Sequence, residues 1–332
     1  ESYEFLKDDL GILSYVNKDN QLFLVMAKDL YQINIDESSY KVLAEGINRD
    51  NFVVSDMRKC MKPGDKAALL MVHFGTTYDQ TRALTIEAIN EKAKTSFPDF
   101  TFAEAYTSRI VIRRLKERNV MKQTPREALT QLAEKGYTHI LIQSTNIIDG
   151  VEMESLRKDV ATVADRFKEV RVGNPLLYSV EDCERVVEIM AEKQPERGVL
   201  VLVGHGTYTP STATYAMIDY MAAAKGCQSM LVGTIEGYPS FDNMLARLKA
   251  SGKKEVTLLP FMLVAGDHAN NDIAVDWKEA LEKEGFHVTV RMEGLGQNPK
   301  IQDIFIDHLR FSSLHKVKDI MTKKKEYAAG KE

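Results

Sequence analysis

The sequence predicts an α/β protein with two similar lobes, each a four-stranded parallel sheet flanked by helices, after a small N-terminal β-rich extension. From residue 66 onward, short β-branched apolar runs alternate with amphipathic stretches of helical length, as in βαβ units. This pattern is repeated. Strand starts at 67, 139 and 170 recur at 198, 255 and 287, so the offsets are 131, 116 and 117 residues. The repeat predicts that the second lobe duplicates the first.

The first 65 residues lie outside this repeat. They contain three short apolar runs separated by turn residues, and each run has the composition of a strand. The strands are expected at Leu10–Val16, Gln21–Ala27 and Leu30–Ile35. Residues 1–65 are therefore predicted to form a β-rich extension, and nothing in their pattern indicates catalysis.

Eight strands are expected after the extension, four in each lobe. Apolar residues at helical spacing fill the stretches between them. The strands of the first lobe are predicted at Ala67–Gly75, Thr101–Thr107, His139–Ile147 and Val170–Leu176, and those of the second at Gly198–Gly206, Met230–Gly237, Glu255–Val264 and His287–Gly294. The lobes are accordingly placed at 66–195 and 196–332, and the second lobe includes a C-terminal helix.

The first lobe contains one additional helix, predicted at Thr124–Lys135. Its Thr-Pro-Arg-Glu start combines an N-cap threonine, a proline at the first helical position and a glutamate at the third. Because the second lobe has no counterpart of this helix, the insertion accounts for the larger first offset of the repeat.

Composition excludes several classes of protein. The 332 residues include 44 Lys and Arg against 48 Asp and Glu, a formal charge of −4, whereas proteins that coat nucleic acid need a strong basic excess. No apolar run reaches the roughly 20 residues that a membrane-spanning helix requires. Because the chain begins at Glu1, a preceding signal peptide would indicate the periplasm or cell envelope, and a bare Met the cytoplasm.

Common cofactor motifs are missing from the sequence. Cys60, Cys183 and Cys227 lie far apart, with no spacing suited to an iron–sulfur cluster or structural zinc. The segment Gly204-His205-Gly206 lacks the third glycine of a dinucleotide-binding turn, and no GxxxxGK[ST] or GxSxG motif occurs. We therefore expect no Fe–S cluster, no bound nucleotide and no α/β-hydrolase chemistry.

Candidate chemistry is expected where strands end, because ligands of open α/β sheets bind beyond the carboxyl ends of the strands. The segment Gly266-Asp267-His268 follows the seventh strand, and Glu236 ends the sixth between two glycines. Either residue can bind a metal or move a proton, and either can be an ordinary helix cap. His205 is interpreted as a brace of its glycine turn, and His73 as a core histidine.

Six of these segments, in order, resemble the anaerobic cobalt chelatases that act on sirohydrochlorin, which share the class II chelatase fold with ferrochelatases. The resemblance covers about 66 to 310. It is carried by Phe74-Gly75-Thr76-Thr77-Tyr78 with Thr81-Arg82, Ala105-Tyr106-Thr107-Ser108, Ile147-Ile148-Asp149-Gly150-Val151-Glu152, Gly204-His205-Gly206-Thr207, Gly233-Thr234-Ile235-Glu236-Gly237-Tyr238-Pro239 and Leu263-Val264-Ala265-Gly266-Asp267-His268-Ala269-Asn270-Asn271-Asp272.

The resemblance implies a tetrapyrrole held between the lobes and a divalent metal bound by two histidines and a glutamate. His268 and Glu236 match two of the implied ligands, with His268 also accepting a proton. The third falls at Asn146, where the family pattern has histidine. Asparagine cannot take up a proton near neutral pH, so a weakened metal site is expected. The resemblance implies that the tetrapyrrole meets Asn146, His205, Gly75, Thr76, Arg82, Arg109 and Tyr238, with the arginines on the ring carboxylates.

Two functions follow from the resemblance, and a third remains open beside them. The first is insertion of Co²⁺, with Fe²⁺ as second choice, into sirohydrochlorin in cobalamin or tetrapyrrole biosynthesis, where the metal is a substrate. The second is a non-catalytic haem- or tetrapyrrole-binding protein for haem uptake or transfer, to which Asn146 and the extension point. The third is a two-lobe binding protein for another anionic small molecule. A homo-oligomer is compatible with all three.

Overall fold

The computed structural model describes residues 12–18, 21–26, 30–34, 39–44, 52–266 and 269–329. Two compact units are distinguished in it. One unit comprises residues 56–314, and the other contains the described residues up to Ser55 and from His315 onward. The predicted boundaries at 65 and 195 stay predictions, because both sheets of the predicted lobes lie within the unit 56–314.

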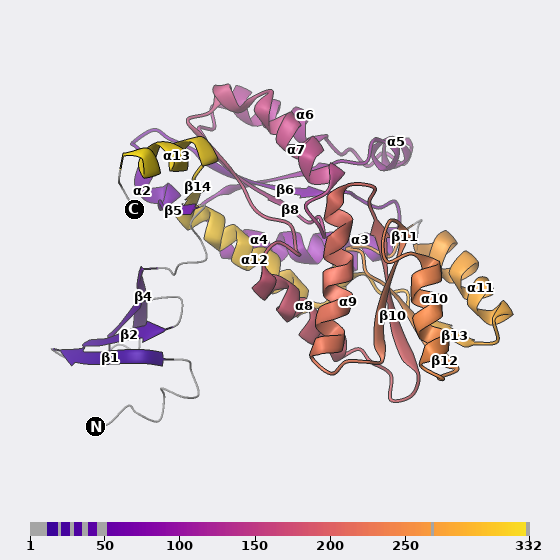
Figure 1. The fold of residues 1–332 in the computed structure, drawn as a ribbon. Coiled ribbons are helices and arrows are strands. Elements are labelled where there is room, and N and C mark those ends of the chain that lie inside the picture. Colours follow the sequence, from indigo (N-terminus) through magenta and orange to yellow (C-terminus); the bar gives the residue numbers. More distant parts are fainter. Residues whose placement is uncertain are drawn as a thin grey trace. The chain divides into compact units, whose positions relative to one another are not determined.

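Two parallel sheets form the framework of the unit 56–314 (Figure 1). They have the order β7-β6-β8-β9 and β11-β10-β12-β13, so the first strand of each half lies between its second and third strands in both sheets. The bounds are β6 Ala67–His73, β7 Thr101–Tyr106, β8 His139–Ser144, β9 Glu169–Val172, β10 Val199–Gly206, β11 Met230–Glu236, β12 Glu255–Pro260 and β13 His287–Val290. The predicted fold class and all eight predicted strands are confirmed.

Helices and helical turns connect these strands. Those of the first half are α2 Met57–Cys60, α3 Asp79–Arg82, the π-helical η2 Ala83–Glu87, α4 Ala88–Ser96, α5 Arg109–Glu117, α6 Pro125–Glu134, α7 Val151–Ala161, η3 Ala164–Arg166 and α8 Val180–Ala191. Those of the second half are η4 Pro210–Thr212, α9 Ala213–Ala224, α10 Phe241–Ala250, the π-helical η5 Ala269–Trp277, α11 Lys278–Lys283, η6 Leu295–Gln297 and α12 Pro299–Leu314. The additional helix predicted in the first lobe is α6, and Thr124 caps it in a capping box with Glu127.

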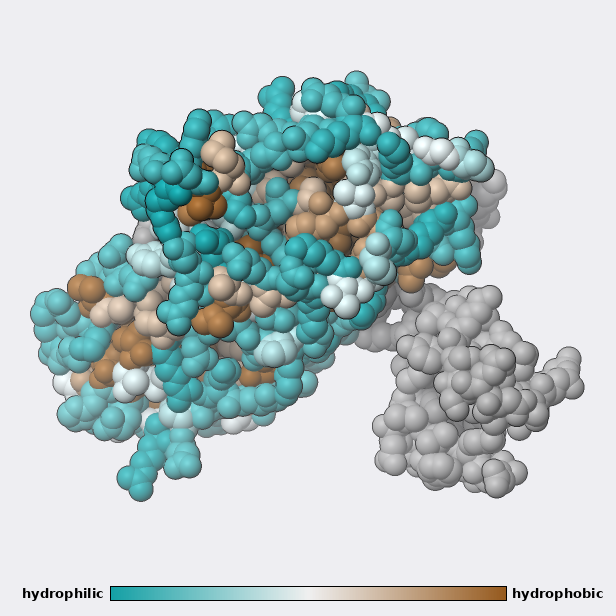
Figure 2. Space-filling model, turned by 180° about the vertical axis from the view of Figure 1, so that it is seen from behind, coloured by the Kyte–Doolittle hydropathy of each residue, from teal (hydrophilic) through white to brown (hydrophobic). Residues whose placement is uncertain are grey.

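Each sheet is covered on both faces, which explains its continuous apolar strands. On the first sheet, side chains of α6 and α7 pack on one face and those of α4 and α12 on the other (Figure 1). Strands β6 and β8 are buried over nearly their whole length as a result. On the face seen in Figure 2 the surface of the coloured residues is mainly hydrophilic, and hydrophobic residues gather only in patches.

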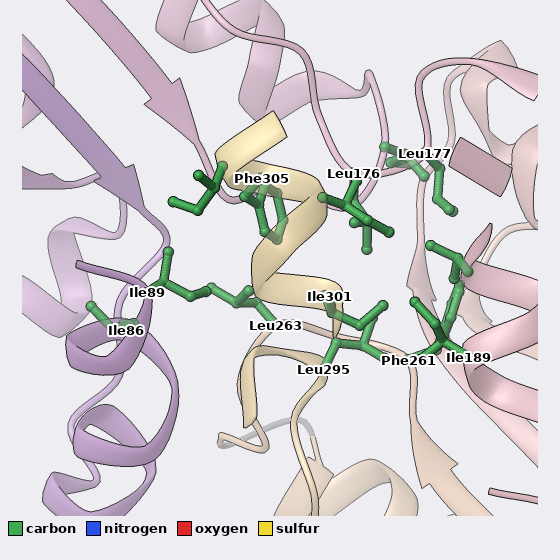
Figure 3. Packing of buried hydrophobic residues seen from close by; sticks show 14 of the residues in the cluster. Ile86, Ile89, Leu176, Leu177, Ile189, Phe261, Leu263, Leu295, Ile301 and Phe305 are labelled. Atoms are coloured by element: carbon green, nitrogen blue, oxygen red, sulfur yellow. The ribbon is translucent and has the colours of Figure 1, made fainter. Parts of the chain in front are cut away.

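Two helices pack on the half of the unit to which they do not belong in sequence. Helix α8 contacts α9 of the second half, and α12 contacts β8, β9 and α4 of the first. Figure 3 shows Ile301 and Phe305 of α12 within this packing, with Ile86 and Ile89 to one side of the helix and Phe261 to the other. One hydrophobic cluster therefore runs through both halves and fixes the two sheets relative to each other. An amphipathic pattern shows which face of a helix is apolar, but not which sheet that face will meet.

The second unit is described by itself. Strands β1 Ile12–Lys18, β2 Gln21–Met26, β3 Leu30–Asn34 and β4 Ser39–Ala44 form an antiparallel sheet in sequence order. The predicted strands correspond to β1 to β3, whereas β4 was not predicted. Strands β5 Phe52–Val54 and β14 His315–Val317 pair antiparallel, and α13 Ile320–Ala328 follows. No helix among the described residues is long and apolar enough to span a membrane.

Candidate active site

A cavity of about 370 Å³ lies where the strands of both sheets end. Residues that follow β6, β7, β8 and β12 line it, together with the last residues of β10 and β11 and with Tyr215 of α9. In each sheet the order in which strands are added reverses between the first and third strands, which is the point where open α/β sheets bind ligands. The two sheets therefore bring their ligand-binding edges to one shared cavity.

His205 and Glu236 line this cavity from neighbouring strands of the second sheet. Glu236 is the last residue of β11 and is paired in register with Gly206, the residue after His205. The His205 Nδ1 lies 3.2 Å from the Gly206 carbonyl oxygen. Because a carbonyl only accepts, Nδ1 is the donor in this contact. The predicted backbone brace of His205 is present, and a metal bound by this ring would meet Nε2 rather than Nδ1.

Glycines allow these two strand ends to lie against each other. Gly206 has a φ of +86°, and a Cβ built on it would lie 1.5 Å from the Glu236 carbonyl oxygen. Gly237 has a φ of +120°, and its Cβ would meet the Thr212 hydroxyl and the Thr207 carbonyl. Gly206 and Gly237 therefore leave room for neighbouring parts of the chain, and this close packing fixes the Glu236 backbone.

His268 and Asp267 lie outside the described residues. In the sequence, His268 follows Gly266 by two positions, and Gly266 lines the cavity. Helix η5 begins directly afterwards at Ala269. Within the described residues, which omit His268, no three His, Cys, Asp or Glu side chains are grouped as metal ligands would be.

Asn146 lines the cavity from the first sheet, in the segment that follows β8. Its backbone is fixed, because its N–H donates to the Ser144 hydroxyl and its carbonyl accepts from the Leu176 N–H. Its side-chain Nδ2 is buried and has no hydrogen-bond partner among the described residues. The amide is therefore available to a bound molecule, but it lies on a different sheet from His205 and Glu236.

His73 does not take the place of a cavity histidine. The ring is fully buried, with Nδ1 2.9 Å from the Thr145 hydroxyl and Nε2 2.9 Å from the Asn90 amide oxygen. Burial lowers the pKa of His73, while Glu104 and the hydrogen bond to Asn90 oppose this effect. His73 is absent from the cavity lining, whereas Thr145 belongs to it.

The remaining predicted contact residues divide into two groups. Gly75 and Thr76 line the cavity, and the absent side chain of Gly75 leaves room for the Tyr106 ring. Tyr238 is exposed and does not line it. Among the described lining residues there is no Lys or Arg.

The two predicted arginines lie in different surroundings. Arg82 is largely buried and pairs with Asp79 at 2.8 Å and with Glu87 at 3.2 Å. Arg109 is exposed at the start of α5, between Ser108 and Ile110, which both line the cavity. Arg109 therefore lies at the rim of the cavity, whereas Arg82 is engaged in ion pairs with two exposed carboxylates close to it in the sequence. The predicted role of each toward a substrate stays a prediction.

A group of buried polar side chains lies behind the cavity wall that the first sheet forms, and the sequence did not reveal it. Thr145, His73, Asn90 and Glu104 form one connected chain of hydrogen bonds, although Thr145 and His73 are 72 positions apart. No spacing rule connects residues of β6, α4, β7 and the end of β8. The one available signal was a histidine inside an otherwise apolar strand, because a buried imidazole needs polar partners.

Comparison with known proteins agrees with this architecture. The family model described as cobalt chelatase (CbiK) matches residues 67–313. The sirohydrochlorin cobaltochelatase of Salmonella typhimurium is 37% identical over 252 residues, covering 74% of this chain and 95% of that protein. Sirohydrochlorin cobaltochelatase CbiKC of Nitratidesulfovibrio vulgaris is 31% identical over 258 residues, covering 74% of this chain and 90% of that protein.

Solved structures show the same fold at low identity. SirB from Bacillus subtilis with Fe³⁺ has a TM-score of 0.56 at 16% identity and covers 75% of this chain and 96% of its own. The sirohydrochlorin chelatase SirB in complex with cobalt has a TM-score of 0.54 at 14% identity, with 75% and 95% covered. From the extent of the family match and of the curated relatives, the chain belongs to the CbiK family of cobalt chelatases.

Proposed function

We propose that this protein inserts Co²⁺ into sirohydrochlorin in the cavity between its two sheets, with Fe²⁺ as an alternative metal substrate. The observation that carries the proposal is the meeting of His205 and Glu236 at one wall of a cavity formed by both sheets, in a member of the cobalt chelatase family. The curated relatives are sirohydrochlorin cobaltochelatases and are covered almost completely by this chain, which supports the same substrates here.

His205, Glu236 and His268 are the proposed ligands of the incoming metal. Two imidazoles and a carboxylate suit Co²⁺ and Fe²⁺. This assignment differs from the expectation that the second histidine has been lost at Asn146. His205 lies on the strand beside Glu236, and its Nδ1 is engaged by the Gly206 carbonyl, whereas Asn146 follows a strand of the other sheet. The metal site then needs no substitute for a missing histidine, and the Asn146 amide is left to contact the tetrapyrrole.

The cavity supplies two further requirements of metal insertion. Two pyrrole N–H bonds must break, so that the electron pairs left on the nitrogens bind the metal while the protons pass to acceptors. Apolar side chains such as Phe261, Leu263 and Ile148 line much of the cavity and limit access of water to the ring. Because no Lys or Arg belongs to the described lining, we place the ring carboxylates at the rim, where Arg109 lies.

The proposal is tested by following the absorbance of sirohydrochlorin with Co²⁺ and the purified full-length chain. Glu236→Gln keeps the size of the side chain but removes the charge that binds the metal, so we expect insertion to slow by about 100-fold or more. Glu255→Gln is the matched control, because Glu255 is exposed at the opposite end of its strand. Wild-type insertion no faster than the uncatalysed rate would overturn the proposal. If the protein then also bound haem tightly, a haem-binding function would be favoured instead.

The placement of the ring carboxylates gives a separate prediction. Arg109→Gln is expected to raise the KM for sirohydrochlorin several-fold. The proposed ion pair between Arg109 and a ring carboxylate is exposed, so added salt should reduce the difference in KM between wild type and variant. Arg82→Gln is expected to lower the melting temperature slightly, since it removes the ion pairs that the largely buried Arg82 side chain makes with the exposed carboxylates of Asp79 and Glu87. Steady-state kinetics and thermal unfolding of both variants check this. A larger rise of KM in Arg82→Gln than in Arg109→Gln would contradict it.

A further inference from the structure

A buried chain of polar side chains begins at the first-sheet wall of the cavity. Thr145, which lines the cavity and is 2% exposed, contacts Nδ1 of His73, and Nε2 of His73 contacts the Asn90 amide oxygen. The Asn90 Nδ2 donates to Glu104 over 2.9 Å, and Glu104 pairs with Lys122 near the surface. The first four residues come from the segment after β8, β6, α4 and β7, and Lys122 lies between α5 and α6.

The direction of each hydrogen bond in this series of side chains follows from Glu104, the member of Thr145, His73, Asn90 and Glu104 that lies farthest along the series from the cavity. Glu104 is a carboxylate that only accepts, so it fixes Asn90 with Nδ2 toward Glu104 and the amide oxygen toward His73. The Nε2 of His73 must then donate, which leaves the Nδ1 lone pair to accept the Thr145 hydroxyl proton. The Thr145 oxygen keeps its own lone pairs, and they are available at the cavity wall.

Metal insertion requires a proton acceptor that is not itself a metal ligand, and the buried side chains behind Thr145 can supply one. If the lone pairs of His205 and His268 bind the metal, neither imidazole can accept a pyrrole proton at the same time. Glu236 is committed in the same way. The cavity then requires an acceptor that does not bind the metal, and it is best placed on the first sheet, opposite His205 and Glu236.

We propose that Thr145 and His73 form a relay that accepts a pyrrole proton during metal insertion, an inference that rests on the proposed function. The pyrrole N–H bond breaks, its electron pair stays on the nitrogen, and the proton passes to the Thr145 oxygen. At the same time the Thr145 hydroxyl proton moves to Nδ1 of His73. The resulting imidazolium still donates from Nε2 to the Asn90 amide oxygen. The Asn90 Nδ2 in turn donates to Glu104 and keeps this carboxylate close to the imidazolium. After product leaves, the proton returns through Thr145 to water in the cavity.

The groups around His73 suit a temporary proton acceptor. Asn90 contacts it from α4, Thr145 from the end of β8, and the Tyr106 ring of β7 lies edge-on at 6.2 Å. The charged groups that face it are Glu104 and, beyond it, Lys122. Burial lowers the pKa of His73 and keeps the free ring neutral at pH 7, while the negative charge of Glu104 favours the imidazolium once it forms.

The protonation state of His73 can be measured in the free protein by ¹⁵N NMR of the imidazoles. We expect one protonated nitrogen, Nε2, and one lone-pair nitrogen, Nδ1, at pH 7. His73→Gln identifies the resonances. A ring protonated at Nδ1, or at both nitrogens, would overturn the relay, because Nδ1 could then not accept the Thr145 proton, and the hydroxyl would be left to donate to the Val72 carbonyl, 3.4 Å away.

Kinetics of Co²⁺ insertion test the relay itself. Thr145→Val removes the hydroxyl with little change of shape, and we expect kcat to fall about 100-fold while KM for sirohydrochlorin changes less than twofold. Thr145→Ser keeps the hydroxyl and should recover most of the rate. His73→Gln should match Thr145→Val, and the double variant should lose no more than either alone. Thr257→Val is the control, because Thr257 is a buried threonine of β12 outside the cavity lining.

The outcomes separate this inference from the proposed function. Unchanged kcat in Thr145→Val, additive losses in the double variant, or equal losses in Thr145→Ser and Thr145→Val would overturn the relay while wild-type insertion still supports the chelatase. Absence of wild-type insertion would overturn both. A fall in kcat with rescue by serine, on proteins with equal melting temperatures, supports the relay, because a merely structural role would not distinguish the two substitutions in this way.

Discussion

Replacing His205 with alanine is expected to reduce cobalt insertion by more than 100-fold. Changes to residues that only orient a metal ligand cost about 10- to 100-fold in affinity or activity, and loss of a ligand itself should exceed this range. The Nε2 of His205 is the nitrogen that would bind, because Nδ1 donates to the Gly206 carbonyl. The apparent Kd for Co²⁺, measured by calorimetry without tetrapyrrole, should rise together with the loss of insertion.

Two further variants make this result specific. His287→Ala removes an exposed histidine at the start of β13, at the opposite end of the sheet from the cavity, and should retain wild-type insertion. His205→Ala combined with Asn146→His places an imidazole at the position where the sequence resemblance implied a histidine ligand. We expect no recovery, because residue 146 lies on the first sheet and Glu236 on the second. Recovery to half the wild-type rate would show that the metal is bound from the first sheet instead.

Much of the fold could be predicted from the sequence because each strand carries its own signal. Buried parallel strands are continuous apolar runs, and Thr124 with Glu127 marks the start of α6 through a local capping pattern. Local signals do not report on partners far away in the sequence. The helices α8 and α12 were therefore assigned to their own halves, although each packs on the other half.

The candidate site shows the same division between local and distant information. The glycine turns at strand ends predicted a ligand-binding edge near His205 and Glu236, because the carboxyl ends of parallel strands meet at one edge. Asn146 was implied only by the family resemblance, and all three residues line the cavity. The position of Arg82 could not be predicted, since its ion pairs with Asp79 and Glu87 depend on how α3 and η2 fold. The neighbours of His73 were equally hidden, because they come from three separate segments: α4, β7 and the end of β8.

Gly206 couples the fold of the second sheet to its chemistry. Its φ of +86° lies in the region that favours glycine, and the space its side chain would need is filled by the Glu236 carbonyl oxygen. Gly226 offers a matched comparison, because its φ is +81° and nothing lies within 4 Å of the position of its Cβ. An alanine at either position adds similar backbone strain of about 1 kcal/mol or more, but only Gly206→Ala also forces the ends of β10 and β11 apart.

Gly206→Ala is therefore expected to lower the free energy of unfolding by more than Gly226→Ala does, and to abolish cobalt insertion even where the protein remains folded. Separating the two strand ends moves Glu236 away from His205, and an error of about 1 Å in a catalytic arrangement can cost about 100-fold in rate. Urea unfolding of both variants measures the first effect, and the insertion assay at a temperature where both are folded measures the second. Equal stability and equal insertion rates in the two variants would show that the contact between Gly206 and Glu236 does not position the metal ligands.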